Sequence, residues 1–175
     1  MATNFQKYFF PYKIGQGSEG LVYRISNKHA AKVPRESSGR GNLKKESRIA
    51  EILFEEGVSV PKPEGIFKIR NLDLISSVIP AEAFVMEYIA GKTGFEFFSD
   101  SLFFKRDSSG FVGTPSFLKH SEEYAHVKNL HDEEIKKARE LGFLSFDAEF
   151  RGNFIWSPER DRVYLIDFGM WEWEV

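Results

Sequence analysis

Two charged residues in the first third of the sequence lie in apolar surroundings. Lys32 belongs to the β-rich run Ala30-Ala31-Lys32-Val33, and Glu46 follows fourteen residues later in a segment with helical periodicity. On that helix Glu46 shares a face with apolar residues at i, i+3, i+4 and i+7 spacing, namely Leu43, Ile49, Ala50 and Leu53. Burying a carboxylate without a counter-ion is costly. The pattern therefore predicts that Lys32 and Glu46 form an ion pair, with the ammonium directed at phosphate oxygens.

Three glycines precede the lysine in the segment Gly15-Gln-Gly17-Ser-Glu-Gly20. β-rich runs at 8–14 and 20–25 lie on either side, so the glycines belong to a hairpin and not to the start of a helix. A glycine turn is common in hairpins and by itself indicates little. Because glycine lacks a Cβ, however, the backbone N–H groups of such a hairpin can approach phosphate oxygens. With Lys32 following Gly20 by twelve residues, the combination predicts a phosphate-binding hairpin.

Two residues with oxygen ligands lie near the other end of the chain. The run Val163-Tyr-Leu-Ile-Asp167-Phe168-Gly169 indicates a strand that ends in a carboxylate and a glycine turn. Asn153 precedes Asp167 by fourteen residues and opens another β-rich run. Carboxylate and amide oxygens suit a Mg²⁺ ion that is shared with phosphate groups. Asn153 and Asp167 are therefore predicted to be the metal ligands.

The elements that must position these residues alternate between strands and helices. Helices are predicted at 42–56, with Asn42 as N-cap and Gly57 as the stop, and at 121–141, ending at Gly142. Strands are predicted at 8–14, 20–25, 29–33, 65–69, 83–88, 154–156 and 163–166. The order predicts an α+β fold whose first half is an antiparallel sheet.

Composition limits the classes of function. The 175 residues suffice for one domain or two small lobes, and eighteen Phe supply material for a core. A net charge of −2 gives no basic field for nucleic acid, and the absence of Cys excludes thiol nucleophiles and disulfides. No apolar run is long enough for a signal peptide or a membrane span. These observations predict a cytoplasmic protein without nucleic-acid or membrane partners.

Taken in order, the motifs resemble those of the protein-kinase-like fold: the glycine loop Gly15, Gly17 and Gly20, then Lys32, Glu46, Asn153 and Asp167. The resemblance implies ATP and Mg²⁺ as cofactors. It implies an N-lobe at residues 1–90, made of an antiparallel sheet and one helix, and a much reduced C-lobe at 91–175 with the catalytic loop.

The same resemblance assigns residues around the adenine of ATP. Phe84-Val-Met86-Glu87-Tyr88-Ile89 resembles the hinge strand that binds adenine through its backbone, with Met86 limiting the rear pocket. Val22 and Ala30 would lie above the base and Ile155 below it.

The catalytic loop departs from the family pattern of His-Arg-Asp, four residues and Asn. Ser145 and Phe146 replace the His and Arg, and five residues separate Asp147 from Asn153, so strict counting reaches Ala148. A one-residue insertion makes Asp147 the candidate catalytic carboxylate, with Glu149 as the alternative. Arg151 is the candidate cation beside the transferred phosphoryl group.

Only Met170–Val175 follow the Asp-Phe-Gly motif, so the usual activation loop and peptide platform are missing from this sequence. The plan is similar to that of small atypical kinases of the RIO and KEOPS-complex kind. It implies a serine/threonine protein kinase, with a protein substrate or partner that contacts the reduced C-lobe. The Phe-rich runs at 96–98 and 102–104, and the tail with Trp171 and Trp173, either pack that lobe or bind the partner.

Two alternatives remain open at this point. The altered catalytic loop favours a pseudokinase, which binds nucleotide or acts as a scaffold without transfer. A small-molecule kinase would need an acidic pocket for a cationic acceptor, whereas the acidic residues in question have the pattern of a helix surface: Glu122, Glu123, Asp132 and Glu133.

Overall fold

The structure, a computed structural model, describes the chain in six ranges, 12–16, 20–34, 39–69, 81–97, 121–145 and 153–173. Several predictions lie outside these ranges, namely those on residues 8–11, Gly17, residues 102–104, Asp147, Ala148, Glu149 and Arg151. The chain divides into two compact units. The first comprises Met1–Gly57 and Pro61–Ile89, and the second comprises Val58–Val60 and Ala90–Val175. The short connection Val58–Val60 therefore belongs to the second unit although both of its neighbours belong to the first.

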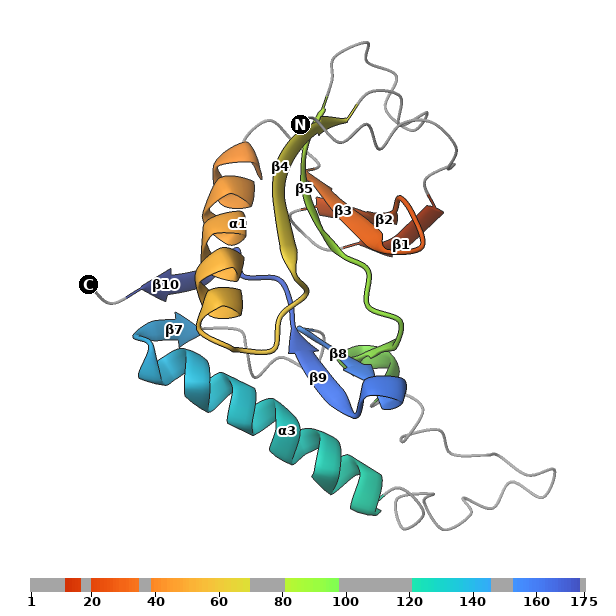
Figure 1. The fold of residues 1–175 in the computed structure, drawn as a ribbon, viewed down its shortest axis with the longest axis vertical. Coiled ribbons are helices and arrows are strands. Elements are labelled where there is room, and N and C mark those ends of the chain that lie inside the picture. The colour runs from red at the N-terminus through yellow and green to blue at the C-terminus, as the bar shows by residue number, and fades with distance from the viewer. Residues whose placement is uncertain are drawn as a thin grey trace, which may run out of the picture. The chain divides into compact units, whose positions relative to one another are not determined.

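A five-stranded antiparallel sheet forms the first unit, in the order β1-β2-β3-β5-β4 (Figure 1). Its strands are β1 (Tyr12–Gln16), β2 (Gly20–Arg24), β3 (His29–Pro34), β4 (Pro63–Ile69) and β5 (Ala81–Glu87). The turn between β2 and β3 is closed by the Ser26 hydroxyl, which accepts hydrogen bonds from the N–H groups of Lys28 and His29. All five predicted strands of this half are found, although residues 8–11 of the first prediction lie outside the described ranges.

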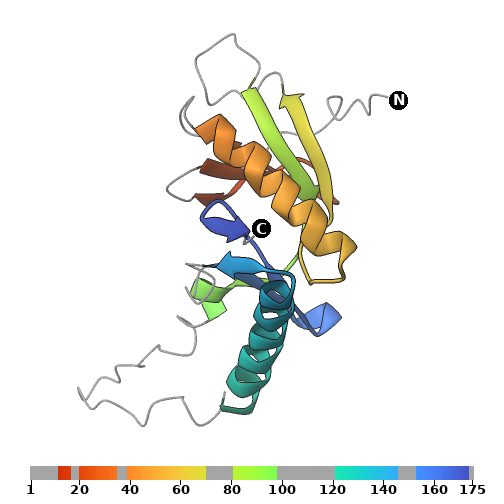
Figure 2. The same ribbon diagram turned by 90° about the vertical axis from the view of Figure 1, so that its left-hand side faces the viewer.

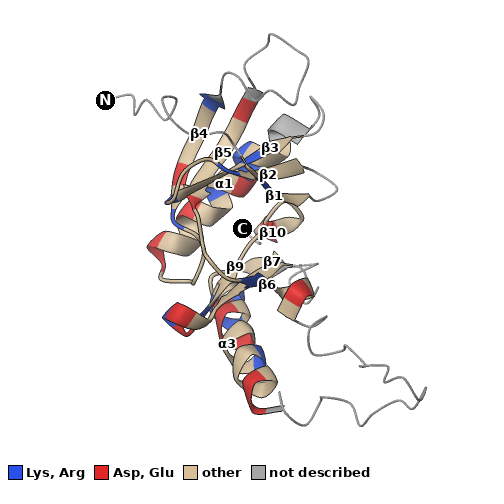
Figure 3. Cartoon of the chain, turned by 90° about the vertical axis from the view of Figure 1, so that its right-hand side faces the viewer, with Lys and Arg blue, Asp and Glu red and all other residues tan. Residues whose placement is uncertain are grey.

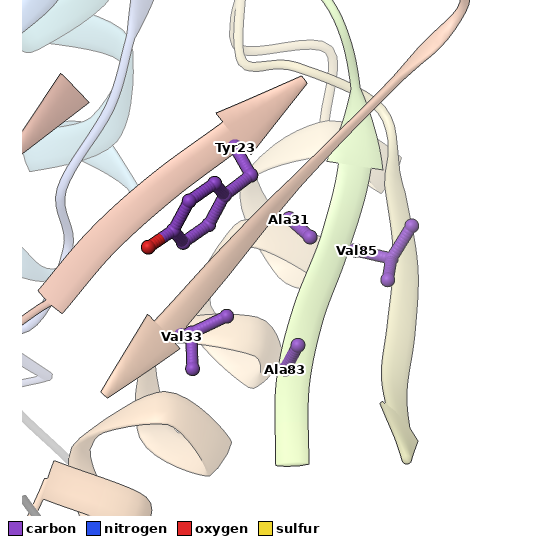
Figure 4. Close-up of a cluster of buried hydrophobic side chains, with 5 residues drawn as sticks. All are labelled: Tyr23, Ala31, Val33, Ala83 and Val85. Atoms are coloured by element: carbon purple, nitrogen blue, oxygen red, sulfur yellow. The ribbon is translucent and has the colours of Figure 1, made fainter. Parts of the chain in front are cut away.

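One face of this sheet carries a cluster of buried side chains from β2, β3 and β5 (Figure 4). Its members are at most 2% exposed, and they are Tyr23, Ala31, Val33, Ala83 and Val85. Because side chains alternate between the faces of a strand, every second residue contributes to the cluster. The residues between them face the other way.

Helix α1 (Gly39–Glu55) runs alongside β4 and β5 (Figures 1 and 2). All five residues of the predicted inner face are buried, whereas Lys44, Arg48 and Glu55 are exposed. The helix ends as predicted at Gly57, which has a φ of +80° and donates its N–H to the Phe54 carbonyl. The predicted N-cap at Asn42 is wrong, because the helix begins at Gly39. Helices gain most of their stability from packing, so an anchored helix can extend through residues of low propensity such as Gly39 and Gly41.

The second unit is built on helix α3 (Ser121–Glu140) and the strand pair β8 (Phe154–Ser157) and β9 (Arg162–Leu165). The short β6 (Lys92–Thr93) completes a three-stranded sheet, and the 3-10 turn η2 (Pro158–Arg160) joins β8 to β9. His126 of α3 packs edge-on against Trp156 and bonds Asp161, while His131 packs against Phe154. These contacts show that Phe154 and Trp156 face α3.

Helix α3 is one continuous helix that ends before Gly142, as predicted. Charged residues of both signs occur along its length (Figure 3). Across the six described ranges, no helix combines the length and the apolar character needed to cross a lipid bilayer.

The strands β7 (Phe143–Ser145) and β10 (Trp171–Trp173) were not predicted from the sequence. They form an antiparallel pair. Trp173 stacks on Phe143, and the buried Trp171 contacts both Phe143 and Phe168. The segment after the Asp-Phe-Gly motif therefore folds back onto the second unit, which was one of the two possibilities left open.

A short helical turn at residues 94–97 begins with a capping box. The Thr93 hydroxyl accepts a hydrogen bond from the Glu96 N–H, and the Glu96 carboxylate accepts one from the Thr93 N–H. Phe97 is buried in the second unit and Phe95 is 67% exposed. Of the predicted run 96–98, Phe97 therefore packs inside, and Phe98 lies outside the described residues.

Candidate functional site

A buried ion pair joins β3 to α1 in the first unit. The Lys32 Nζ lies 2.7 Å from the Glu46 Oε2, and the two residues are 6% and 2% exposed. The predicted pair is confirmed. Desolvation of two charges offsets most of what their attraction contributes, so a buried pair is weak evidence for a stabilising role. Its effect here is to hold an ammonium at one defined place on the sheet.

Gly20 lies against the stem of this lysine. A Cβ on Gly20 would be 2.8 Å from the Val33 carbonyl oxygen, 3.3 Å from the Lys32 Cγ and 3.4 Å from its Cε. A Cβ on Gly15, by contrast, would meet no described residue except Val22, at 3.5 Å. Gly20 is therefore required by a close contact with β3, whereas Gly15 has room for a methyl group.

We expect Gly20→Ala to lower the free energy of unfolding by about 1–3 kcal/mol, because an overpacked methyl group must displace β3 or the lysine stem. Gly15→Ala is the matched control and should change it by less than about 0.5 kcal/mol. Urea denaturation of both variants measures the difference. Equal stability of the two variants would show that Gly20 is not under this steric constraint.

Four of the predicted nucleotide-binding residues share the face of the sheet opposite the apolar cluster. Val22 is opposite Lys32 in the β2–β3 ladder, and Ala30 is opposite Met86 in the β3–β5 ladder. Residues opposite each other in an antiparallel pair lie on the same face, as do residues two apart in one strand. The sheet therefore brings Val22, Ala30 and Met86 to the same face as the ammonium of Lys32.

The backbone donors at the end of β5 are partly engaged within the first unit. The Glu87 N–H donates to the Lys62 carbonyl and the Tyr88 N–H to the Lys28 carbonyl, both at 2.8 Å. The Arg24 guanidinium lies over the Tyr88 ring, 4.3 Å from its centroid. These contacts hold Glu87 and Tyr88 in position and use their N–H groups.

Ile89 is the next residue along the chain and the last of the segment that resembles a hinge strand. Within the described ranges, no hydrogen bond to the Ile89 N–H is found, and the residue is 4% exposed. Among the residues that the structure describes, the Ile89 N–H is therefore not used by the fold, unlike those of Glu87 and Tyr88. The sequence alone carries no signal for this, because the partners of Glu87 and Tyr88 come from remote segments.

In the second unit, Asn153 and Asp167 lie at the same end of the β8–β9 hairpin. Phe154 is opposite Leu165 in the ladder, and the Ile166 N–H donates to the Asn153 carbonyl at 3.0 Å. Asp167 follows directly, and both residues are half-buried. The half-buried Ile155 alternates with Phe154 and Trp156, which face α3, so it lies on the other face of the hairpin.

The backbone of Asp167 has a φ of +65°, in the left-handed region. Side chains other than Gly rarely adopt this conformation, although Asp and Asn tolerate it best, and strained residues of this kind concentrate at functional sites. The turn sends the buried Phe168 against Trp171, with ring planes 90° apart and centroids 5.1 Å apart. This packing fixes the chain on the C-terminal side of Asp167.

The side-chain oxygens of Asn153 and Asp167 fit a magnesium ion whose remaining ligands are phosphate oxygens. Among the residues that the structure describes, no three His, Cys, Asp or Glu side chains gather as a self-sufficient metal site. Mg²⁺ commonly takes only one or two protein ligands and fills its remaining positions with waters and phosphate oxygens. The Asp167 carboxylate and the Asn153 amide at one end of the hairpin satisfy that requirement.

The acidic residues considered for a cationic acceptor do not form a pocket. Glu122, Glu123, Asp132 and Glu133 are all exposed on α3. Partial burial acts to raise the pKa of Asp132, but hydrogen bonds from Lys128 and His131 outweigh it and hold this pKa below its usual value. Asp132 is thus an ordinary surface carboxylate with neighbouring bases.

Comparisons with known proteins identify the fold. Neither the protein-family models nor the curated protein sequences include a match to this chain. Among solved structures, a Stt7 homolog from Micromonas algae soaked with ATP is similar with a TM-score of 0.61 at 12% identity, over 93% of this chain and 49% of that one. WbdD is similar with a TM-score of 0.59 at 13% identity, over 100% of this chain and 36% of that one.

The chain thus spans about half the length of the first of these proteins and about a third of the second. At such low identity the likeness shows the fold alone. The predicted α+β architecture with its antiparallel N-terminal sheet is confirmed, and the fold is kinase-like.

Proposed function

We propose that this protein is an ATP- and Mg²⁺-dependent phosphotransferase that modifies serine or threonine side chains of a protein. The observation that carries the proposal is the buried Lys32–Glu46 pair on the sheet face of Val22, Ala30 and Met86, directly under Gly20. A structural neighbour was soaked with ATP, which supports the choice of nucleotide. Membership among the small RIO and KEOPS-like kinases is part of the same proposal.

In this proposal the first unit binds ATP. The hairpin of Gly15, Gly17 and Gly20 covers the phosphates with its backbone N–H groups, and Lys32 binds them through its ammonium. Val22 and Ala30 contact one side of the adenine. The segment from Met86 to Tyr88 lies along the edge of the adenine ring, and the Ile89 N–H donates a hydrogen bond to the base.

The second unit contributes the residues that act on the phosphoryl group. Asn153 and Asp167 hold Mg²⁺, which neutralises phosphate charge when bound, and Ile155 contacts the other side of the adenine. Asp147 orients the acceptor hydroxyl and accepts its proton, with Glu149 as the alternative. Arg151 stabilises the charge of the transferred group.

The Asp167→Asn substitution tests the metal assignment with little disturbance of the backbone. Asn also tolerates a positive φ, whereas Ala at this position would add strain of about 1–2 kcal/mol. We expect Asn to reduce phosphoryl transfer by at least about 100-fold and to remove most of the Mg²⁺-dependent part of ATP binding, because one ionic ligand is lost. Thermal stabilisation by ATP, with and without Mg²⁺, measures the binding. An unchanged Mg²⁺ dependence would exclude Asp167 as a ligand.

Transfer itself is tested with radiolabelled ATP and a generic protein acceptor, beside Asp147→Asn and Glu149→Gln variants. Label incorporation that is lost in Asp147→Asn alone identifies Asp147 as the catalytic carboxylate. Loss in Glu149→Gln alone moves that role to Glu149. Stabilisation by ATP without transfer would instead favour the pseudokinase, which binds nucleotide but does not transfer phosphate.

A further inference from the structure

The connection between α1 and β4 has an unusual environment for a short link. Val58, Ser59 and Val60 are 3%, 6% and 2% exposed, and they belong to the second unit, whereas α1 and β4 belong to the first. The chain that leaves the Glu46 helix therefore enters the second unit at Val58 and leaves it again before Pro61.

A carboxylate from α3 binds the backbone in the middle of this link. The Ser59 N–H donates to the Glu134 Oε2 at 2.7 Å, and the other carboxylate oxygen accepts from the Lys137 Nζ, also at 2.7 Å. The Glu134 side chain is 12% exposed. Hydrogen bonds to an ionised acceptor are stronger than neutral ones, and a partly buried one is less weakened by water.

The carbonyl group of Ser59 is bound by β9. The Leu165 N–H donates to the Ser59 carbonyl at 2.8 Å, two residues before Asp167. The next N–H, that of Ile166, donates to the Asn153 carbonyl. Glu134, Ser59 and β9 are thus joined in one series of hydrogen bonds that ends at the candidate metal ligands.

We propose that Glu134 is a positioning residue for Asp167, acting through the backbone of Ser59. It holds the segment Val58–Val60 against β9, the strand that leads to Asp167, and so fixes where that strand ends. This inference rests on the proposed function, but the anchor itself can be measured without any nucleotide.

The first measurement is amide hydrogen exchange of the nucleotide-free protein. Glu134→Ala is expected to speed exchange at Ser59 and Leu165 by about tenfold, since a hydrogen bond to a charged group is lost. Glu134→Gln keeps an acceptor oxygen in the same place and should retain most of the protection. Two controls on the same helix should change exchange by less than about twofold: Lys137→Ala removes only the ion pair, and Glu133→Ala removes a carboxylate that makes no hydrogen bond or ion pair within the described residues.

The second measurement is ATP affinity with and without Mg²⁺ for the same four variants. Glu134→Ala is expected to weaken the Mg²⁺-dependent part of binding by about threefold to tenfold, and Glu134→Gln to restore it. Unchanged exchange at Ser59 would overturn the anchor. Faster exchange together with an unchanged Mg²⁺-dependent affinity for ATP would show that Glu134 has only a structural role and would overturn the positioning role. If the wild-type protein binds no ATP, the proposed function and the positioning role both fail, and the exchange data still decide whether the anchor exists.

Discussion

The Lys32→Met variant is expected to lose about 3–5 kcal/mol of stability, because the buried Glu46 carboxylate loses the ammonium that lies 2.7 Å away. It is also expected to lose all thermal stabilisation by ATP, since the side chain assigned to the phosphates is gone. Chemical denaturation and ligand-dependent melting measure the two effects separately.

The double variant Lys32→Met with Glu46→Leu separates structure from function. Replacing both members of a buried pair with apolar residues is often neutral for stability, so this protein should unfold within about 1 kcal/mol of the wild type. It should nevertheless show no response to ATP. A double variant that recovers stability and still binds ATP would contradict the assigned role of Lys32. A single variant as stable as the wild type would show that the pair carries no desolvated charge.

Gly91→Ala is expected to be strongly destabilising, by about 3 kcal/mol, because the added methyl group meets backbone and not a flexible side chain. A Cβ at this position would lie 2.2 Å from the Trp156 carbonyl oxygen and 2.9 Å from the Ile155 Cγ2. Neither β6 nor β8 can move away from the added methyl group without breaking the pairing of Lys92 with Trp156. Because Ile155 is one of the residues proposed to bind the adenine, ATP binding is expected to weaken as well.

Gly57→Ala provides the contrast for this prediction. Among the described residues, no atom lies within 4 Å of a Cβ on Gly57, so the expected cost of this substitution comes from the positive φ and is about 1–2 kcal/mol. Urea unfolding of both variants therefore compares a steric cost with a conformational one. A Gly91→Ala protein that is no less stable than Gly57→Ala would show that β6 and β8 are not in close contact there.

The two principal side chains of the first unit could be predicted from the sequence for a simple reason. Glu46 occupies an apolar helix face and Lys32 an apolar strand, and each anomaly is resolved by the other. The buried positions of α1 follow from helical periodicity, and its end follows from Gly57. These signals are local, since they depend on residues within a few positions of one another.

Other features depend on partners that are distant in the sequence. The start of α1 at Gly39 and the pairing of β7 with β10 could not be predicted, because three-residue strands and helix starts are decided by packing and carry little periodicity. The need for a glycine at position 91 comes from Trp156, sixty-five residues away. Gly91 and Trp156 are too far apart for any local sequence pattern to include the two residues.

The sequence alone determined the chemical inventory of this protein: a glycine hairpin, a lysine, a glutamate, and an amide and a carboxylate near the end, in the order that the kinase-like fold uses. The tertiary structure decided which groups remain available. It uses the N–H groups of Glu87 and Tyr88 within the fold, whereas the Ile89 N–H has no partner among the described residues. It also binds the Ser59 backbone between Glu134 and Leu165. The physical reason is that side-chain types are written in the sequence, whereas backbone hydrogen-bond partners are assigned only when distant segments meet.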